Sequence, residues 1–524
     1  MQSTVESAAA IPPGATRKEW LGLAVLAFPC LLLAMDFTVL HLAVPALTRE
    51  LAPSSTQLLW IVDIYGFLIA GSLITMGTLG DRIGRRKLLL IGAATFGLAS
   101  IAAAFASSAA MLIVTRGLLG VAGATLMPST LALIRNMFHD DHQRRIAIAV
   151  WINSFVIGGA IGPLLGGVML EYFWWGSVFL LNVPVMVLLL ILGPLLLPEF
   201  REASFGRLDI PSAALSLSGM LSIIYGVKRF AADGPGTAAL LAVTLGLVLA
   251  TIFVRRQQRL ADPLIDMGLF RVPPFSAAVV AQMVAALSMG GIYLFVAQYL
   301  QLVLGLSPLQ AGLALLPSNI GGIAGTMLAP FLVRRFQAAH VIAAGMILAA
   351  LGISVLTQVG DGPPVATIVA SFVVMSIGFS GAMTLTTDVI MSVAPPERAG
   401  AASGISETSA ELGMALGVAV LGSVGTASYR AIMARDLPAG LSGSEAESVR
   451  ATLAEALEVT SRLNEPLGSG VATIARDAFS QSLALVSGLS AALVIATSIV
   501  ILILLRRVRT GTQQEGDPPM PAAA

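Results

Sequence analysis

Long apolar stretches alternate with short polar connectors along almost the whole chain. A helix needs about 20 mostly apolar residues to cross a bilayer, and fourteen stretches approach or exceed that length. We predict membrane-spanning helices near residues 21–43, 58–79, 88–106, 110–133, 146–170, 177–197, 209–227, 237–254, 275–301, 309–332, 339–358, 364–392, 400–427 and 479–505. The pattern predicts an all-α integral membrane protein.

The composition agrees with this pattern and excludes several classes of protein. Of 524 residues, 56% are hydrophobic and 11% are charged, whereas a soluble domain carries about 25% charged residues. A net charge of +1 indicates no basic surface for nucleic acid. One cysteine, Cys30, and four histidines without a HExxH pair indicate no metal site. The chain has no phosphate-binding P-loop, so we expect no use of ATP and no bound cofactor.

The basic residues follow the positive-inside rule when both termini are placed in the cytoplasm. The connectors DRIGRRK, RNMFHDDHQRR, RRQQRL and VRRF then all fall on the cytoplasmic side, where short loops carry an excess of Lys and Arg. We predict an uncleaved first helix after Trp20, cytoplasmic termini and a long external loop at 428–478. Within that loop a surface helix is predicted at 443–458.

A weak internal repeat predicts two similar halves. GTLGDRIGRRK at 77–87 is echoed by LAPFLVRRFQ at 328–337, and internal repeats are common in secondary transporters. The predicted parts are a tail at 1–19, an amino-terminal six-helix bundle at 20–200, a two-helix insertion at 201–258, a carboxy-terminal six-helix bundle at 259–506 containing loop 428–478, and a tail at 507–524. The two inserted spans have no ionisable residue between Asp209 and Lys228 or between Asp233 and Arg255, so we expect a peripheral, structural role for them.

Five acids lie inside the apolar stretches: Asp36, Asp63, Asp388, Glu407 and Glu411. A charged side chain at mid-bilayer costs about 2.5–3.5 kcal/mol, so such acids usually mark an ion, proton or cation path. Glu407 and Glu411 are spaced i, i+4, which places them on one helix face, where they would titrate as a coupled pair. For each acid the alternative is a structural role, and for Asp388, near the end of its span, it is contact with solvent. Arg116, inside the fourth span, needs an acidic partner or water for the same reason.

Two glycine-containing motifs add to these acids. The connector after the second span contains Gly77, Asp81, Arg82, Gly84, Arg85 and Arg86. In the fifth span, GGAIGPLLGG places Gly158, Gly162 and Gly166 in one bare stripe, with Pro163 and Gly167 beside it. Small residues at this spacing let helices approach closely, and Pro163 bends its helix. The alternatives are a basic loop that only sets topology and an ordinary packing face.

Together with MDFTVLHLAVPAL (35–47), LIVTRGLLGVAGA (112–124) and FLLNVP (179–184), these motifs resemble the fourteen-span drug:proton antiporters of the major facilitator superfamily. The resemblance covers roughly residues 20–505. It implies two six-helix bundles plus two additional helices, a cytoplasmic gate at the first motif, an antiporter motif in span five, and a role for Arg116 in proton coupling. Some relatives carry a further acid in span ten, where this chain has Gly322, which puts dicationic substrates in question.

The resemblance implies that the chain is no enzyme but a proton-coupled antiporter of the cell membrane. It would export quaternary ammonium compounds, dyes and viologens, with protons as the coupling ion. We expect it to act as a monomer in the bilayer, with neither nucleic acid nor ATP as a partner. One alternative is an exporter of a single metabolite or self-made antibiotic; the span-five motif argues against an importer. A non-transporting receptor or scaffold is disfavoured because several spans contain acids.

Overall fold

A computed structural model describes residues 15–199, 209–234, 236–260, 263–361, 365–393, 399–438 and 441–505. Every regular element in these ranges is a helix. Fourteen of the helical segments are long and apolar enough to cross a membrane, which confirms the predicted class and number of spans.

The amino-terminal helices are packed around one apolar core. They are α1 (Arg17–Leu51), α2 (Ser55–Ile83), α3 (Arg85–Ala104), α4 (Ala109–Met137), α5 (Asp141–Tyr172), α6 (Ser177–Leu180) and α7 (Asn182–Leu196). The start of α2 shows how the sequence sets these bounds: the Ser54 side chain accepts from the Gln57 backbone N–H, and the Gln57 side chain returns to Ser54. The core they share is drawn almost wholly from residues 23–197.

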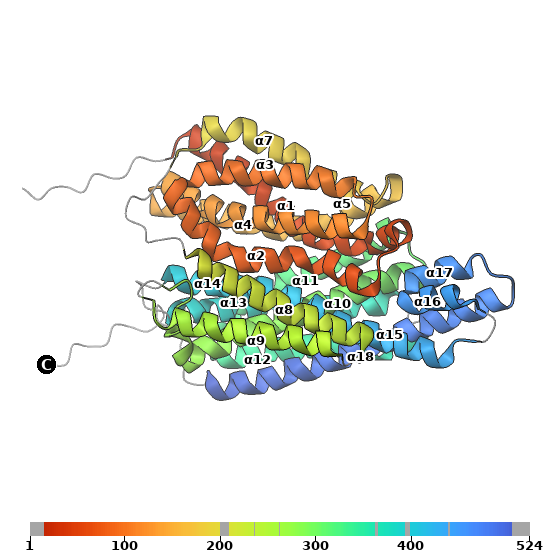
Figure 1. The fold of residues 1–524 in the computed structure, drawn as a ribbon. Helices are drawn as coiled ribbons and strands as arrows, with labels where there is room; N and C mark the ends of the chain where they lie inside the picture. The colour runs from red at the N-terminus through yellow and green to blue at the C-terminus, as the bar shows by residue number, and fades with distance from the viewer. Residues whose placement is uncertain are drawn as a thin grey trace, which may run out of the picture.

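A second apolar core lies among the carboxy-terminal helices. They are α10 (Pro273–Gln298), α11 (Pro308–Val333), α12 (Ala338–Val355), α13 (Val365–Val393), α14 (Ala399–Leu416), α15 (Gly422–Asp436) and α18 (Leu467–Leu504). A π-helical turn at Gly417–Leu421 joins α14 to α15 within one span. Figure 1 shows the first group in red to yellow on one side of the molecule and the second in green to blue on the other.

The inserted helices, α8 (Ile210–Asp233) and α9 (Thr237–Gln257), differ from each other and from the prediction. Most of α9 is exposed, but α8 packs against α2 and against the α14–α15 segment as well as α9. The predicted span ended at 227, whereas α8 continues to Asp233 and includes Lys228, which is 1% exposed. The buried Lys228 adds to the peripheral, structural role expected for α8, and that role stays a prediction.

The long loop after α15 contains two short helices instead of the single one predicted at 443–458. These are α16 (Gly443–Ala451) and α17 (Leu453–Thr460), which project at one end of the molecule in Figure 1. The break occurs because Thr452 is extended, with φ −147° and ψ 156°, and caps α17 by accepting from the Glu455 N–H. The Ser55 hydroxyl donates to the Ala451 carbonyl at 2.6 Å, so this segment contacts the start of α2.

Candidate functional site

A cavity of about 280 Å³ lies where the two groups of helices meet. Its wall is almost entirely apolar, and Glu411 is the acid that faces it. The lining side chains come from α1, α2, α4, α5, α10, α13 and α14: Leu33, Ala34, Thr38, Ile69, Met127, Phe155, Ala286, Met383, Ala410, Glu411 and Met414. A ligand in this cavity would touch both halves at once.

Close packing of α14 against α10 brings Glu411 to this cavity. A Cβ at Gly413 would lie 2.5 Å from the Met283 carbonyl oxygen, and one at Gly417 would lie 2.0 Å from that of Leu287. Glycine at these positions lets the two backbones touch. Among the described residues, neither Glu407 nor Glu411 has an ion-pair partner.

A smaller cavity of about 70 Å³ shares Thr38 and Met414 with the first one. It is lined by polar as well as apolar groups, including His41, Tyr293, Asn319 and Ser376. The rings of His41 and Tyr293 meet edge to face at 5.1 Å. A Cβ at Gly322, the position where some relatives carry an acid, would lie 3.1 Å from the Ser376 hydroxyl beside this cavity.

Asp36 and Arg116 form a buried ion pair between α1 and α4. Their side chains are 5% and 1% exposed, and Arg116 also donates from Nε to the Ile61 carbonyl at 3.2 Å. The guanidinium carbon lies 4.4 Å from the centroid of the Tyr65 ring. Arg116 therefore has the acidic partner that its depth requires, and it connects α1, α2 and α4.

Asp63 is paired with Lys228, a residue that sequence reasoning missed. The ammonium lies 2.8 Å from Oδ1 and 2.7 Å from Oδ2, and both side chains are 0% exposed. The Lys228 ammonium also lies 3.8 Å from the centroid of the Trp60 ring. The sequence did contain a signal that α8 includes Lys228. Apolar Phe230 follows Lys228, and a glycine such as Gly234, which has φ +79° here, is typical of a helix end.

Asp388 stands apart from these groups. It lies on α13, is only partly buried, and lines neither of the two cavities. Of the five predicted acids, the structure brings Glu411 to the central cavity and pairs Asp36 and Asp63, while Glu407, on α14, lines neither cavity. It leaves Asp388 away from both arrangements.

The glycine motif of α5 contacts both halves. A Cβ at Gly158 would lie 2.2 Å from the Leu31 carbonyl oxygen, and one at Gly162 would lie 2.1 Å from the Thr38 hydroxyl, both on α1. The neighbouring stripe faces α11 instead. There a Cβ at Gly167 would lie 2.8 Å from Leu309 Cα, and one at Gly312 would lie 2.2 Å from the Pro163 carbonyl oxygen.

Gly166 continues the first stripe. A Cβ at Gly166 would lie 2.8 Å from the Val39 side chain on α1. Helix α5 is therefore held between α1 of one half and α11 of the other through a surface without side chains. The predicted close-contact face exists, with a second face that the sequence pattern did not assign to a partner.

The predicted gate motif forms the turn between α2 and α3. Gly84 has φ +110°, a conformation that favours glycine, and a Cβ there would meet Glu199 at 2.5 Å. The Arg86 backbone N–H and side chain both contact Glu199, at 3.2 and 3.5 Å, and the side chain donates to the Leu197 carbonyl at 2.9 Å.

The other motif positions differ in their surroundings. Arg85 is buried and Arg82 is exposed, and a Cβ at Gly77 would lie 3.8 Å from the Pro128 side chain on α4. The side chain of Asp81 lies outside the described residues, and Arg86 is the motif residue that connects the turn to the end of α7.

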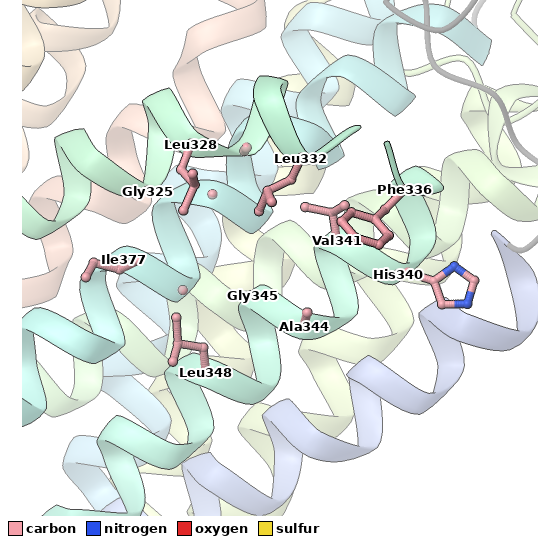
Figure 2. A pocket seen from close by; sticks show the side chains of 13 residues that line it. Gly325, Leu328, Leu332, Phe336, His340, Val341, Ala344, Gly345, Leu348 and Ile377 are labelled. Carbon is pink, nitrogen blue, oxygen red and sulfur yellow. The ribbon is translucent and has the colours of Figure 1, made fainter. Parts of the chain in front are cut away.

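An apolar groove of about 340 Å³ lies on α11, α12 and α13. Figure 2 shows Leu328 and Leu332 on α11 facing Gly345 and Leu348 on α12, with His340 at one end. None of the described residues that line it is acidic. It therefore lacks the group that a cation site requires, and the central cavity is the better candidate.

The fold and the cavity together define a class: a multi-pass helical membrane transporter with its site between two bundles. A model of the Major Facilitator Superfamily matches residues 26–418. The chain belongs to this superfamily, which confirms the predicted resemblance.

Two relatives align over nearly their whole length. The chain is 43% identical to the multidrug efflux pump LfrA of Mycolicibacterium smegmatis, over 94% of this chain and 98% of that protein. It is 36% identical to the methyl viologen resistance protein SmvA of Salmonella typhimurium, over 92% and 98%. A bacterial homolog of the human lysosomal transporter Spinster, solved inward-facing and unoccupied, superposes with a TM-score of 0.65 at 17% identity, over 94% of this chain and 99% of that one. At that identity it supports the fold alone.

Proposed function

We propose that this protein is a proton-coupled efflux antiporter for lipophilic, mainly cationic compounds. The observation that carries the proposal is Glu411: an acid without an ion-pair partner among the described residues, facing an apolar cavity shared by both halves. Such a cavity suits a lipophilic body, and the carboxylate suits its positive charge. The names of two relatives, a multidrug efflux pump and a methyl viologen resistance protein, support the same substrate class.

Proton coupling follows from competition for the acids. A carboxyl group in apolar surroundings is more readily protonated than one in water, so a proton or a cation, but not both, neutralises Glu411 and its neighbour Glu407. A proton that reached Asp36 would in turn release Arg116 from its ion pair. Rocking of one bundle against the other then alternates access, with α5 held between α1 and α11 as the moving contact. Asp388, away from both cavities, would act only as an accessory acid.

The energy source is the inward movement of protons. Each charge that crosses the field is worth about 2.3 kcal/mol per 100 mV, which is enough to drive uphill export. No bound cofactor is invoked, and we propose that a single copy of the chain is the working unit.

We further propose a cell-membrane topology with both termini cytoplasmic and α16–α17 outside, from the asymmetry of Lys and Arg. An Arg450→Cys reporter in a Cys30→Ser background should react with an impermeant thiol reagent in intact cells. Labelling only after permeabilisation would overturn this orientation.

The Glu407→Gln, Glu411→Gln double variant tests the function. Neither acid has a buried basic partner among the described residues, so the variant should fold, and it should lose both proton release on ethidium addition and ethidium efflux from vesicles with an imposed pH gradient. Glu445→Gln, which changes an acid outside the spans on α16, is the matched control. Normal proton release and efflux in the double variant would reject the proposed mechanism.

A second candidate function is export of one metabolite. The chain is 33% identical to a tetracenomycin C resistance and export protein of Streptomyces glaucescens, over 78% of this chain, and Gly322 stands where some drug exporters carry an acid. A growth-inhibition panel of cationic biocides and dyes separates the two. Protection against many unrelated cations supports multidrug export, and protection against none of them supports a dedicated exporter.

A further inference from the structure

Lys228 occupies a fully buried cation site between α8 and α2. Its ammonium contacts both oxygens of Asp63 and lies 3.8 Å from the centroid of the Trp60 ring. A carboxylate beside the face of an indole ring is an arrangement that binds organic cations. Here the cation belongs to the protein itself and is attached to an inserted helix.

Apolar side chains from three helices close this site. Phe67 on α2, Ile224 on α8, and Ala415 of α14 with Ala419 of the π-helical turn form one cluster, against which Trp60 packs. None of these residues lines the central cavity. The site is therefore separated from the cavity that Glu411 faces.

The other charged groups nearby are already placed. On the helices packed against α2, Arg116 of α4 is paired with Asp36, and α14 carries Glu407 and Glu411. Lys228 is therefore the cation that neutralises Asp63, although the sequence grouped Asp63 with the acids that exchange protons.

Helix α8 also contacts α2 through apolar side chains, apart from this ion pair. At Gly71 of α2 an added Cβ would lie 2.2 Å from the Leu217 side chain of α8, so the two helices are already in close apolar contact. Burying two charges costs several kcal/mol of desolvation, and an apolar pair of similar size often stabilises a fold as well. Attachment of α8 alone therefore does not account for the desolvation cost of this pair.

We propose that Lys228 is a specificity-determining residue: it occupies the cation site of Asp63 and Trp60, and so withholds Asp63 from protons and from substrates. This role rests on the proposed function. Lys228 thereby reduces the number of acids that can exchange protons or bind substrate. Because Lys228 lies on α8, the inserted helix determines which acids these are.

Rescue of one substitution by another tests the proposal. Asp63→Asn leaves the Lys228 ammonium buried without a counter-charge, and ethidium efflux should fall at least about tenfold. Adding Lys228→Gln removes that charge and allows an amide–amide hydrogen bond, so efflux and proton release should return to within about twofold of the parent. Failure of this rescue would show that Asp63 itself exchanges protons or binds substrate, and would overturn the proposal.

Lys228→Gln alone supplies a readout that a purely structural pair would not change. It frees one acid, so ethidium affinity measured against pH should show a titration step that is absent from both the parent and the Asp63→Asn, Lys228→Gln variant. Equal pH profiles for Lys228→Gln and the double variant would overturn the proposal. If Lys228→Gln does not fold, the rescue of Asp63→Asn decides alone.

The failure of the proposed function would look different. A parent protein that neither binds ethidium nor releases protons would reject cation export. The melting temperature against pH would then test the pair: a fall with rising pH in Lys228→Gln, absent from the double variant, supports an acid freed by loss of Lys228, and equal curves reject it.

Discussion

The acids of the amino-terminal half and those of the carboxy-terminal half are buried in opposite electrostatic settings. Asp36 is paired with Arg116, and Asp63 with Lys228. Glu407 and Glu411 lie on α14 and form no ion pair among the described residues, although the Arg135 charge acts on Glu407 from a greater distance. Glu411 faces the central cavity.

This difference separates acids whose charge is fixed from acids whose charge can change. A buried carboxylate with a basic partner stays ionised, because removing its charge would leave the partner uncompensated. A buried carboxyl without a partner is relieved by a proton or by any cation that reaches it. Exchange with substrate is therefore expected first at α14, and Asp36 can respond only together with Arg116.

The largest expected effect comes from breaking a pair. Arg116→Met leaves Asp36 buried and uncompensated, which should lower the free energy of unfolding by about 3–5 kcal/mol. Glu411→Gln leaves no described basic residue without its ion-pair partner, so it should change the free energy of unfolding by less than about 1 kcal/mol. Denaturant titration of the purified proteins in detergent measures both.

The control for this pair is Asp36→Asn combined with Arg116→Met, which should regain most of the lost stability, because no unpaired charge remains. If Arg116→Met were as stable as Glu411→Gln, the distinction between paired and unpaired acids would have no energetic basis.

A smaller effect is expected when the packing of α1, the helix that carries the paired Asp36, is changed without removing a charge. In Gly162→Ala the new Cβ would lie 2.1 Å from the Thr38 hydroxyl, in the turn of α1 that follows Asp36. Overpacking of this kind costs about 1–3 kcal/mol, and dye efflux should fall sharply as α1 is displaced. Gly159→Ala is the matched control, since its Cβ would lie within 4 Å of no atom of the described side chains or backbone. Equal efflux by the two variants would show that the contact between α5 and α1 has no role in transport.

The spans could be predicted because the bilayer constrains length and polarity together. Their ion pairs could not be predicted, because partners such as Asp63 and Lys228 are 165 residues apart in the sequence. A hydropathy pattern gives no information on which distant residues lie close together in space. The α8 boundary was wrong because a lysine lowers local hydropathy even when its charge is neutralised inside the protein. The break between α16 and α17 had a local signal, Thr452 three residues before Glu455, which is typical of a helix start.

The smallest expected effect concerns a partly buried acid outside the membrane spans, where burial can be tested apart from transport. Glu455 on α17 lies outside the spans and, like Glu411, has no ion-pair partner among the described residues. Burial, with the Glu458 charge nearby, raises the pKa of Glu455 from 4.5 to about 7. Since the folded segment binds the proton more tightly than the open one, stability should fall as pH rises from about 4.5 to 7 and then stay level. With allowance for solvent screening of this half-exposed group, the loss is about 1 kcal/mol. Glu455→Gln should remove it, slowing hydrogen exchange of α17 relative to the parent at pH 8 but not at pH 4. Equal exchange in the two proteins at both pH values would mean that burial alone does not govern an unpaired acid here, and would weaken the same argument for Glu411.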